Sequence, residues 1–270
     1  TAGVNLRYQY YDDNTIATQD SSTGNQGDHQ FIPGIYIQDA WDVSKKLALL
    51  YGSRLDYYQG HGLIPAPRFN LKYQFDEWTA LRFNFGTGFR IVNLFTEDHA
   101  FVTGSRQVEL EEALNPERSN NASLNFNHVF TLGKSQGSIN VDAFYTYFTN
   151  AIFPDYEIAN RIIYRNLNGY AETKGMSLTL NQQFAFPLSW SLVGNLQWAT
   201  QTEQDELGNL QTSDIEYAPR YSGAAVLQYT HQPWGLTAAY TAQLTGTMAL
   251  PEVYDLDGQG NVMDAYVAAF

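Results

Sequence analysis

The sequence predicts an all-β chain that forms an antiparallel transmembrane β-barrel, and three observations support this fold. Apolar and polar residues alternate with a period of two along most of the chain, which places successive side chains on opposite faces of a strand. The alternating segments often reach about ten residues, the length that a tilted strand needs to cross a bilayer. Short and long connections alternate between the segments, as they do in outer-membrane barrels.

The composition is consistent with this fold and excludes several others. The 270 residues include 19 Tyr, 16 Phe and 5 Trp, yet the mean hydropathy is −0.35. No stretch approaches the roughly 18 consecutive apolar residues of a membrane helix. The absence of cysteine excludes disulfides and thiolate metal sites. The net charge of −13 gives no cationic face for nucleic acid, so no nucleic-acid partner is expected.

The predicted strands follow one another along the chain, each with one apolar and one polar face. The first, for example, has Val4, Leu6, Tyr8 and Tyr10 on its apolar face. A soluble sandwich also alternates, but its strands usually have only about five or six residues. We count roughly 11–12 strands, of which the clearest are residues 4–10, 47–57, 69–75, 81–89, 124–132, 139–147, 176–186, 190–198 and 236–244.

The connections between these strands differ in length in a regular way. Tight connections are expected at residues 44–45, 76–77, 133–137, 186–189 and 232–233. Long polar loops are expected at residues 12–29, 58–65, 91–117, 150–160, 202–218 and 247–261. All the long loops would therefore lie at one end of the barrel.

Aromatic residues near the predicted strand ends indicate the two membrane interfaces, where amphipathic rings form girdles. These residues are Trp41, Trp78, Phe184, Phe186, Trp190, Trp198 and Trp234. The polar faces would line a lumen, because a charge such as Arg82 facing lipid at mid-depth would cost about 2–4 kcal/mol.

Several motifs resemble the barrel of TonB-dependent outer-membrane receptors. They are GTGFRIVNLF at 86–95, LNPERS at 114–119, FYTYFTN at 144–150, YRNLN at 164–168, ETKGM at 172–176 and APRYS at 218–222. The resemblance is closest to receptors of the ferric-siderophore and colicin-receptor type. It implies that residues 1–270 are part of a single barrel domain, about half of a barrel of about 22 strands. It also implies that this stretch lacks the plug domain and the TonB box, and that residues 264–270 are a truncated strand.

By this resemblance, the chain would belong to an outer-membrane receptor for TonB-dependent uptake of a metal chelate, with a ferric siderophore as the first choice. Cobalamin, haem or another solute, such as a glycan-derived one, remains an alternative, as does a passive porin. The implied partners are the chelate, the TonB–ExbB–ExbD complex acting through a plug, and outer-membrane lipid. No cofactor and no resident metal is expected.

Ligand binding is expected at the long loops and the adjoining strand ends. Guanidinium groups suit an anionic chelate, and nearby tyrosine hydroxyls add hydrogen bonds. In the longest loop, His99 lies close to Glu97 and is a candidate for contact with a metal-bearing ligand. The arginines could instead pair with loop carboxylates or lipid phosphates. The candidate ligand-binding residues are Arg90, Glu97, His99, Arg106, Tyr156, Arg161, Tyr164 and Arg165.

No enzymatic activity is expected. Residues 133–137 match the Gly-x-Ser-x-Gly motif of serine hydrolases, but that motif requires a helix after the serine. Here the period-two pattern continues, which favours a hairpin turn. The five histidines show no paired metal-ligand spacing. Residues 255–261 resemble part of a calcium loop, although the glutamate at its twelfth position is missing and a solvated turn is favoured.

Overall fold

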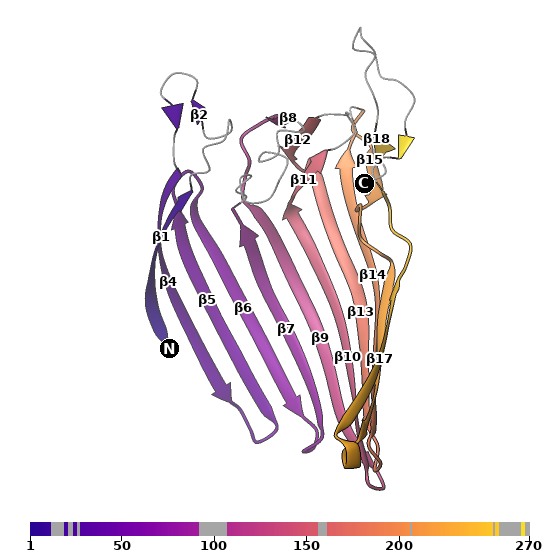
Figure 1. The fold of residues 1–270 in the computed structure, drawn as a ribbon. Coiled ribbons are helices and arrows are strands. Elements are labelled where there is room, and N and C mark those ends of the chain that lie inside the picture. The colour runs from indigo at the N-terminus through magenta and orange to yellow at the C-terminus, as the bar shows by residue number, and fades with distance from the viewer. Residues whose placement is uncertain are drawn as a thin grey trace.

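The structure is a computed structural model that describes residues 1–11, 19–20, 24–25, 28–91, 107–155, 161–205, 207–250, 252–253 and 266–267. Its main feature is a twelve-stranded sheet in the order β1-β4-β5-β6-β7-β9-β10-β13-β14-β16-β17, with β15 paired to β14. Strands that are consecutive in this order pair antiparallel, and the sheet curves around a hollow inner face (Figure 1). The predicted all-β fold, its antiparallel pairing and its number of strands are confirmed.

The long strands have 10 to 17 residues, enough for a tilted strand to cross a bilayer. They are β1 Ala2–Tyr11, β4 Asp28–Asp42, β5 Leu47–Tyr58, β6 Gly62–Gln74, β7 Thr79–Arg90, β9 Glu117–Leu132, β10 Ser135–Asn150, β13 Gly169–Gln183, β14 Leu188–Gln204, β16 Tyr221–His231 and β17 Leu236–Thr245. The short strand β15 spans Leu210–Asp214. No helix among the described residues is long and apolar enough to cross a membrane.

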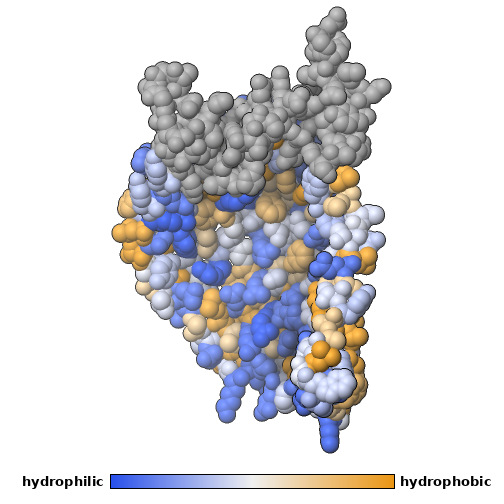
Figure 2. Space-filling view, viewed as in Figure 1, coloured by the Kyte–Doolittle hydropathy of each residue, from blue (hydrophilic) through white to orange (hydrophobic). Residues whose placement is uncertain are grey.

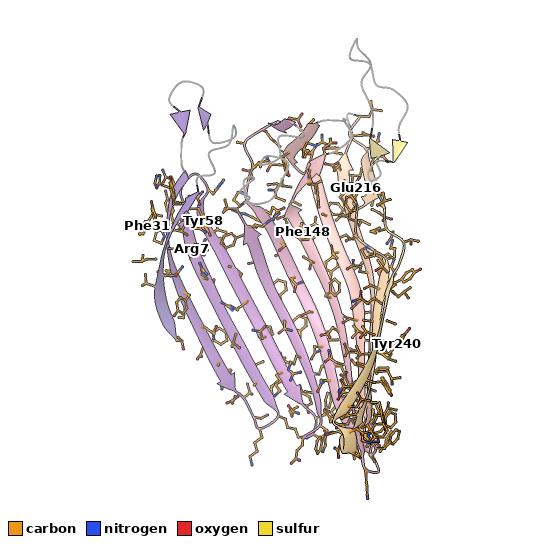
Figure 3. All side chains as sticks on the ribbon, viewed as in Figure 1. Arg7, Phe31, Tyr58, Phe148, Glu216 and Tyr240 are labelled. Atoms are coloured by element: carbon orange, nitrogen blue, oxygen red, sulfur yellow. The ribbon has the colours of Figure 1, made fainter. Side chains whose placement is uncertain are left out.

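The two faces of the sheet differ as the alternation predicts. On the outer face, Val4 and Leu6 of β1 are 71% and 67% exposed, and Phe31 and Tyr240 are exposed on the two flanks (Figure 3). The inner face is hollowed, and hydrophilic side chains run along its centre (Figure 2). An exposed apolar surface that extends over a whole sheet marks contact with a membrane rather than with water. The outer face is therefore the lipid-facing one.

All five predicted tight connections lie at one end of the sheet, which we call the short-turn end. In the turn between β6 and β7, the Asp76 carboxylate accepts hydrogen bonds from the Trp78 N–H and the Thr79 hydroxyl. These bonds hold the pKa of Asp76 below its ordinary value. Between β9 and β10, Gly133 adopts a φ of 64° and Ser135 opens the next strand, so the hairpin predicted there is confirmed.

The predicted long loop at residues 58–65 is wrong. β5 ends at Tyr58 and β6 begins at Gly62, and between them Gly60 adopts a φ of 87° in a tight turn. Pro65 and Pro67 lie on the part of β6 that pairs only with β5. Proline is tolerated there because pairing with β7 begins at Arg68, so its missing N–H leaves no ladder bond unmade.

Other predicted loops contain short strands that the alternation did not reveal. β15 extends the hairpin from β14 within residues 202–218. Further short strands within or next to the predicted loops are β8 Gln107–Leu110, β11 Ile152–Asp155, β12 Arg161–Asn166, β2 Gln19–Asp20, β3 Gly24–Asn25 and β18 Glu252–Val253. β19 Tyr266–Val267 lies within residues 264–270, which were expected to be a truncated strand. Residues 255–261, with the partial calcium motif, lie outside the described residues.

The glycines of β13 and β14 provide a test of how closely these strands pack. A Cβ on Gly175 would lie 2.4 Å from the backbone oxygen of Leu196, whereas a Cβ on Gly194 would have nothing within 4 Å. Gly175→Ala should therefore destabilise the barrel by about 1–3 kcal/mol through overpacking. In the full-length receptor, the temperature that abolishes the fast-migrating gel band should fall for this variant. Gly194→Ala is the matched control, and equal temperatures for both variants would refute the predicted close packing.

Candidate functional site

A small mixed sheet lies at the end of the molecule opposite the short turns, which we call the long-loop end. In it, β11 pairs antiparallel with β12, and β12 pairs parallel with β8. β8 belongs to the connection between β7 and β9, while β11 and β12 belong to the connection between β10 and β13 (Figure 1). Two connections that are distant in the sequence are therefore held together by backbone hydrogen bonds.

Glu117 links this small sheet to the main one. It is 9% exposed and is the first residue of β9. One carboxylate oxygen forms an ion pair with Nε of Arg90, its register partner at the end of β7. The other accepts a hydrogen bond of 2.9 Å from the backbone N–H of Ile152 in β11. A single carboxylate thus fixes the positions of three strands.

Two asparagines hold the segment that leads into β9. The Asn166 side chain donates to the Ala113 carbonyl (2.9 Å) and accepts from the Asn115 N–H (2.8 Å). The Asn150 amide donates to the carbonyl of Pro116 at 3.0 Å. Because a side-chain amide both donates and accepts, it can bind backbone groups in an irregular segment. The contact between Asn115 and Asn166 thus joins the LNPERS segment to the YRNLN segment.

A cavity of about 680 Å³ lies between the small sheet and the main sheet. Its size and its combination of apolar walls with a few polar groups are typical of ligand-binding sites. The buried residues Ala151, Leu167 and Ala171 pack with Phe148 and Phe153 beside it. The lining residues are Arg90, Glu117, Phe148, Ala151, Ile152, Phe153, Pro154, Tyr164, Thr173, Gln197, Ala199, Ile215 and Ala218.

The structure brings two of the predicted site residues together, since Arg90 and Tyr164 both line this cavity. Tyr164 is 5% exposed, whereas the next residue, Arg165, alternates to the other face of β12. Arg165 pairs with Glu203 at 3.8 Å, so this arginine contacts a loop-end carboxylate, as the alternative interpretation proposed. Sequence reasoning missed Glu117, Phe148 and Phe153 as cavity residues, although the LNPERS and FYTYFTN motifs contain the first two.

The other predicted site residues are not tested. Arg161 begins β12 and pairs with Gln107 in register, but its side chain is not among the described ones. Glu97, His99, Arg106 and Tyr156 lie outside the described residues.

The comparison with protein families defines the class of the protein. The family of TonB dependent receptor-like β-barrels matches residues 1–270, so the chain belongs to this family. Its members are outer-membrane receptors and transporters rather than enzymes. No curated protein sequence matches the chain.

Solved structures with the same fold include three bacterial receptors. The ferric enterobactin receptor PfeA of Pseudomonas aeruginosa is 18% identical, with a TM-score of 0.65, and the match covers 98% of this chain and 42% of PfeA. The siderophore receptor PirA of the same species is 17% identical, with a TM-score of 0.61, and the match covers 91% of this chain and 42% of PirA. The FrpB iron transporter of Neisseria meningitidis is 16% identical, with a TM-score of 0.65, and the match covers 90% of this chain and 40% of FrpB. The chain therefore spans less than half of these proteins.

The Glu117 contacts predict a graded effect of substitution on the small sheet. Glu117→Gln retains an oxygen for the Ile152 N–H but loses the ion pair with Arg90. Glu117→Ala loses both and leaves a buried N–H without its partner, which costs about 1–3 kcal/mol. Limited proteolysis of the full-length receptor should cut residues 150–168 fastest in Glu117→Ala and at an intermediate rate in Glu117→Gln.

Glu203→Ala is the control, because the exposed pair with Arg165 contributes only about 0–1 kcal/mol. A cleavage rate for Glu117→Ala equal to that of the control would show that Glu117 does not hold the small sheet.

Proposed function

We propose that this chain is part of the barrel domain of an outer-membrane receptor that takes up a ferric siderophore in a TonB-dependent manner. The cavity at the long-loop end is the observation that carries this proposal. It combines the Arg90 guanidinium and the buried Tyr164 ring with the aromatic rings of Phe148 and Phe153. A guanidinium and a phenol suit the anionic oxygens of a chelate, and the rings contribute apolar contact.

The similar structures support the same solute class. Their names describe a ferric enterobactin receptor, a siderophore receptor and an iron transporter. In the proposed mechanism, the long-loop end faces the extracellular side and captures the chelate. A plug domain closes the lumen, and the TonB–ExbB–ExbD complex displaces it. The barrel contributes a rigid wall, a polar lumen and a selective cavity, and it catalyses no covalent step.

The proposal is tested by uptake of ⁵⁵Fe-enterobactin into cells that express the full-length receptor as their sole receptor for this chelate. Uptake should require the receptor and should stop when an uncoupler dissipates the proton-motive force. Uptake that continues with the uncoupler would identify a porin. Absence of ferric-chelate uptake, together with receptor-dependent uptake of cobalamin or haem, would identify one of these other solutes.

The two arginines at the long-loop end provide a matched test of the cavity. Arg90→Gln removes a charge from the cavity lining and should raise the Kd of ⁵⁵Fe-enterobactin at least about tenfold, since charged hydrogen bonds contribute about 1.5–3 kcal/mol. Arg165→Gln removes the same charge outside the cavity and should leave the Kd unchanged. Binding is measured on intact cells at 0 °C, where uptake is negligible. Equal Kd values for both variants would show that the chelate binds elsewhere.

A further inference from the structure

The inner wall of the sheet is divided into a charged part on β4 to β10 and an almost uncharged part on β13 to β17. On β6 and β7, the inward positions include Arg68, Lys72 and Arg82, which we call the basic stripe. Across β13, β14, β16 and β17, which are described over their whole length, the inward positions carry only one charged residue, Glu203 at the long-loop end. The inward charges are therefore concentrated on one side of the lumen, where the basic stripe lies between the inward carboxylates Asp42 on β4 and Asp142 on β10.

Within the part of the chain that the structure describes, the residues of the basic stripe form no ion pair. Arg68 and Lys72 form no hydrogen bond or ion pair with any described residue. Arg82 donates a hydrogen bond to the side-chain carbonyl oxygen of Asn125 at 3.0 Å. The Asn125 amide in turn donates to the Asp142 carboxylate at 2.7 Å, so Asn125 lies between the two charges. Arg54 of the neighbouring strand β5, in contrast, forms an ion pair with the buried Asp56 at 2.7 Å.

Lys72 and Arg82 also lie directly opposite each other in the ladder between β6 and β7. Like charges in this arrangement destabilise a sheet. A local conflict that the described residues do not compensate is expected at a functional site. Basic groups along a pore wall lower the energy of an anion in the pore and raise its local concentration.

The basic stripe is continuous with the cavity. Arg90, which lines the cavity, and Arg82 lie on the same face of β7, since even-numbered residues of this strand face inward. Arg82 and Arg90 are eight positions apart along β7, which corresponds to about 26 Å. Arg68 lies four residues from Lys72 on β6, about 13 Å. Cationic groups thus extend from the cavity toward the short-turn end.

We propose that the basic stripe is a path that guides an anionic solute along the barrel wall from the cavity toward the short-turn end. This inference rests on the proposed function, because the solute is the anionic ferric chelate that the cavity binds. Arg68, Lys72 and Arg82 act on the charge of the chelate during passage. They do not contribute to its capture, because none of them lines the cavity.

The local electric field can be measured without any chelate, because the chain has no cysteine. Asn70→Cys places a thiol on the inner face between Arg68 and Lys72. Thr179→Cys is its control on the uncharged wall, because both residues are half-buried and lie four positions before the end of their strands. Each variant of the full-length receptor, with any cysteine outside this chain replaced by serine, is treated with anionic sulfonatoethyl and cationic trimethylammonioethyl methanethiosulfonate.

The ratio of the anionic to the cationic reaction rate should be at least about tenfold higher for Asn70→Cys than for Thr179→Cys. Adding Arg68→Gln and Lys72→Gln to Asn70→Cys should remove this difference. Equal ratios at the two positions would overturn the proposal. Protection of Asn70→Cys from both reagents, relieved by the two glutamine substitutions, would also overturn it, since an acidic polypeptide would then cover the stripe.

Transport provides the second measurement. Arg68→Gln combined with Lys72→Gln should lower the rate of ⁵⁵Fe-enterobactin uptake about tenfold and leave the Kd at the cell surface unchanged. The control combines Lys45→Gln with Lys134→Gln, which removes two exposed charges from the short turns. A fast-migrating gel band confirms that each variant is folded.

The outcomes separate this inference from the proposed function. Unchanged uptake in the Arg68 and Lys72 variant, with normal uptake by the wild type, would overturn the path and leave the receptor function intact. Absence of chelate uptake by the wild type would overturn the receptor function and the chelate as the solute, whereas the thiol rates would still show whether the stripe attracts anions.

Discussion

The structure depends on the requirement that a backbone crossing a membrane must satisfy its N–H and C=O groups within the protein. The long strands between β1 and β17 meet this requirement through their register with a neighbour on each side. Strands of 10 to 17 residues follow from it, because pairing must continue through the whole hydrocarbon layer. The same ladder fixes which side chains face lipid and which face the lumen, so the outer surface and the inner wall have one common cause.

At the long-loop end this requirement is relaxed, since backbone groups there can be satisfied by water or by side chains. Glu117, Asn150 and Asn166 bind backbone groups of irregular segments there. These contacts place β11 and β12 against the end of the main sheet and thereby form the cavity. The cavity thus depends on a few side-chain contacts that attach the small sheet to the main sheet, whereas the barrel wall depends on backbone pairing alone.

The wall could be predicted from the sequence and the cavity could not. Alternation along Val4, Leu6 and Tyr8 identifies a strand and its lipid face, because the period of two is a local property. The start of β6 was assigned to a loop at residues 58–65 because the sequence does not show that this half of the strand pairs with β5 alone.

The site was predicted only in part for a similar reason. Arg90, Tyr164 and Arg165 were all candidates, but only the strand geometry of β12 shows that its two neighbouring residues face opposite ways. The contact between Glu117 and the Ile152 N–H joins positions that are 35 residues apart. Glu117 lies within the LNPERS motif, but the motif does not show its partners.

The central claim is that one face of this wall contacts lipid and the other lines an aqueous lumen. Spin labels placed singly at residues 173, 174 and 176–181 of β13, in the full-length receptor reconstituted in lipid, test this claim most directly. Even-numbered positions should be relaxed more by oxygen, which dissolves in lipid, and odd-numbered positions more by a water-soluble nickel complex. The same accessibility at all positions, or a period of 3.6 residues, would contradict the account.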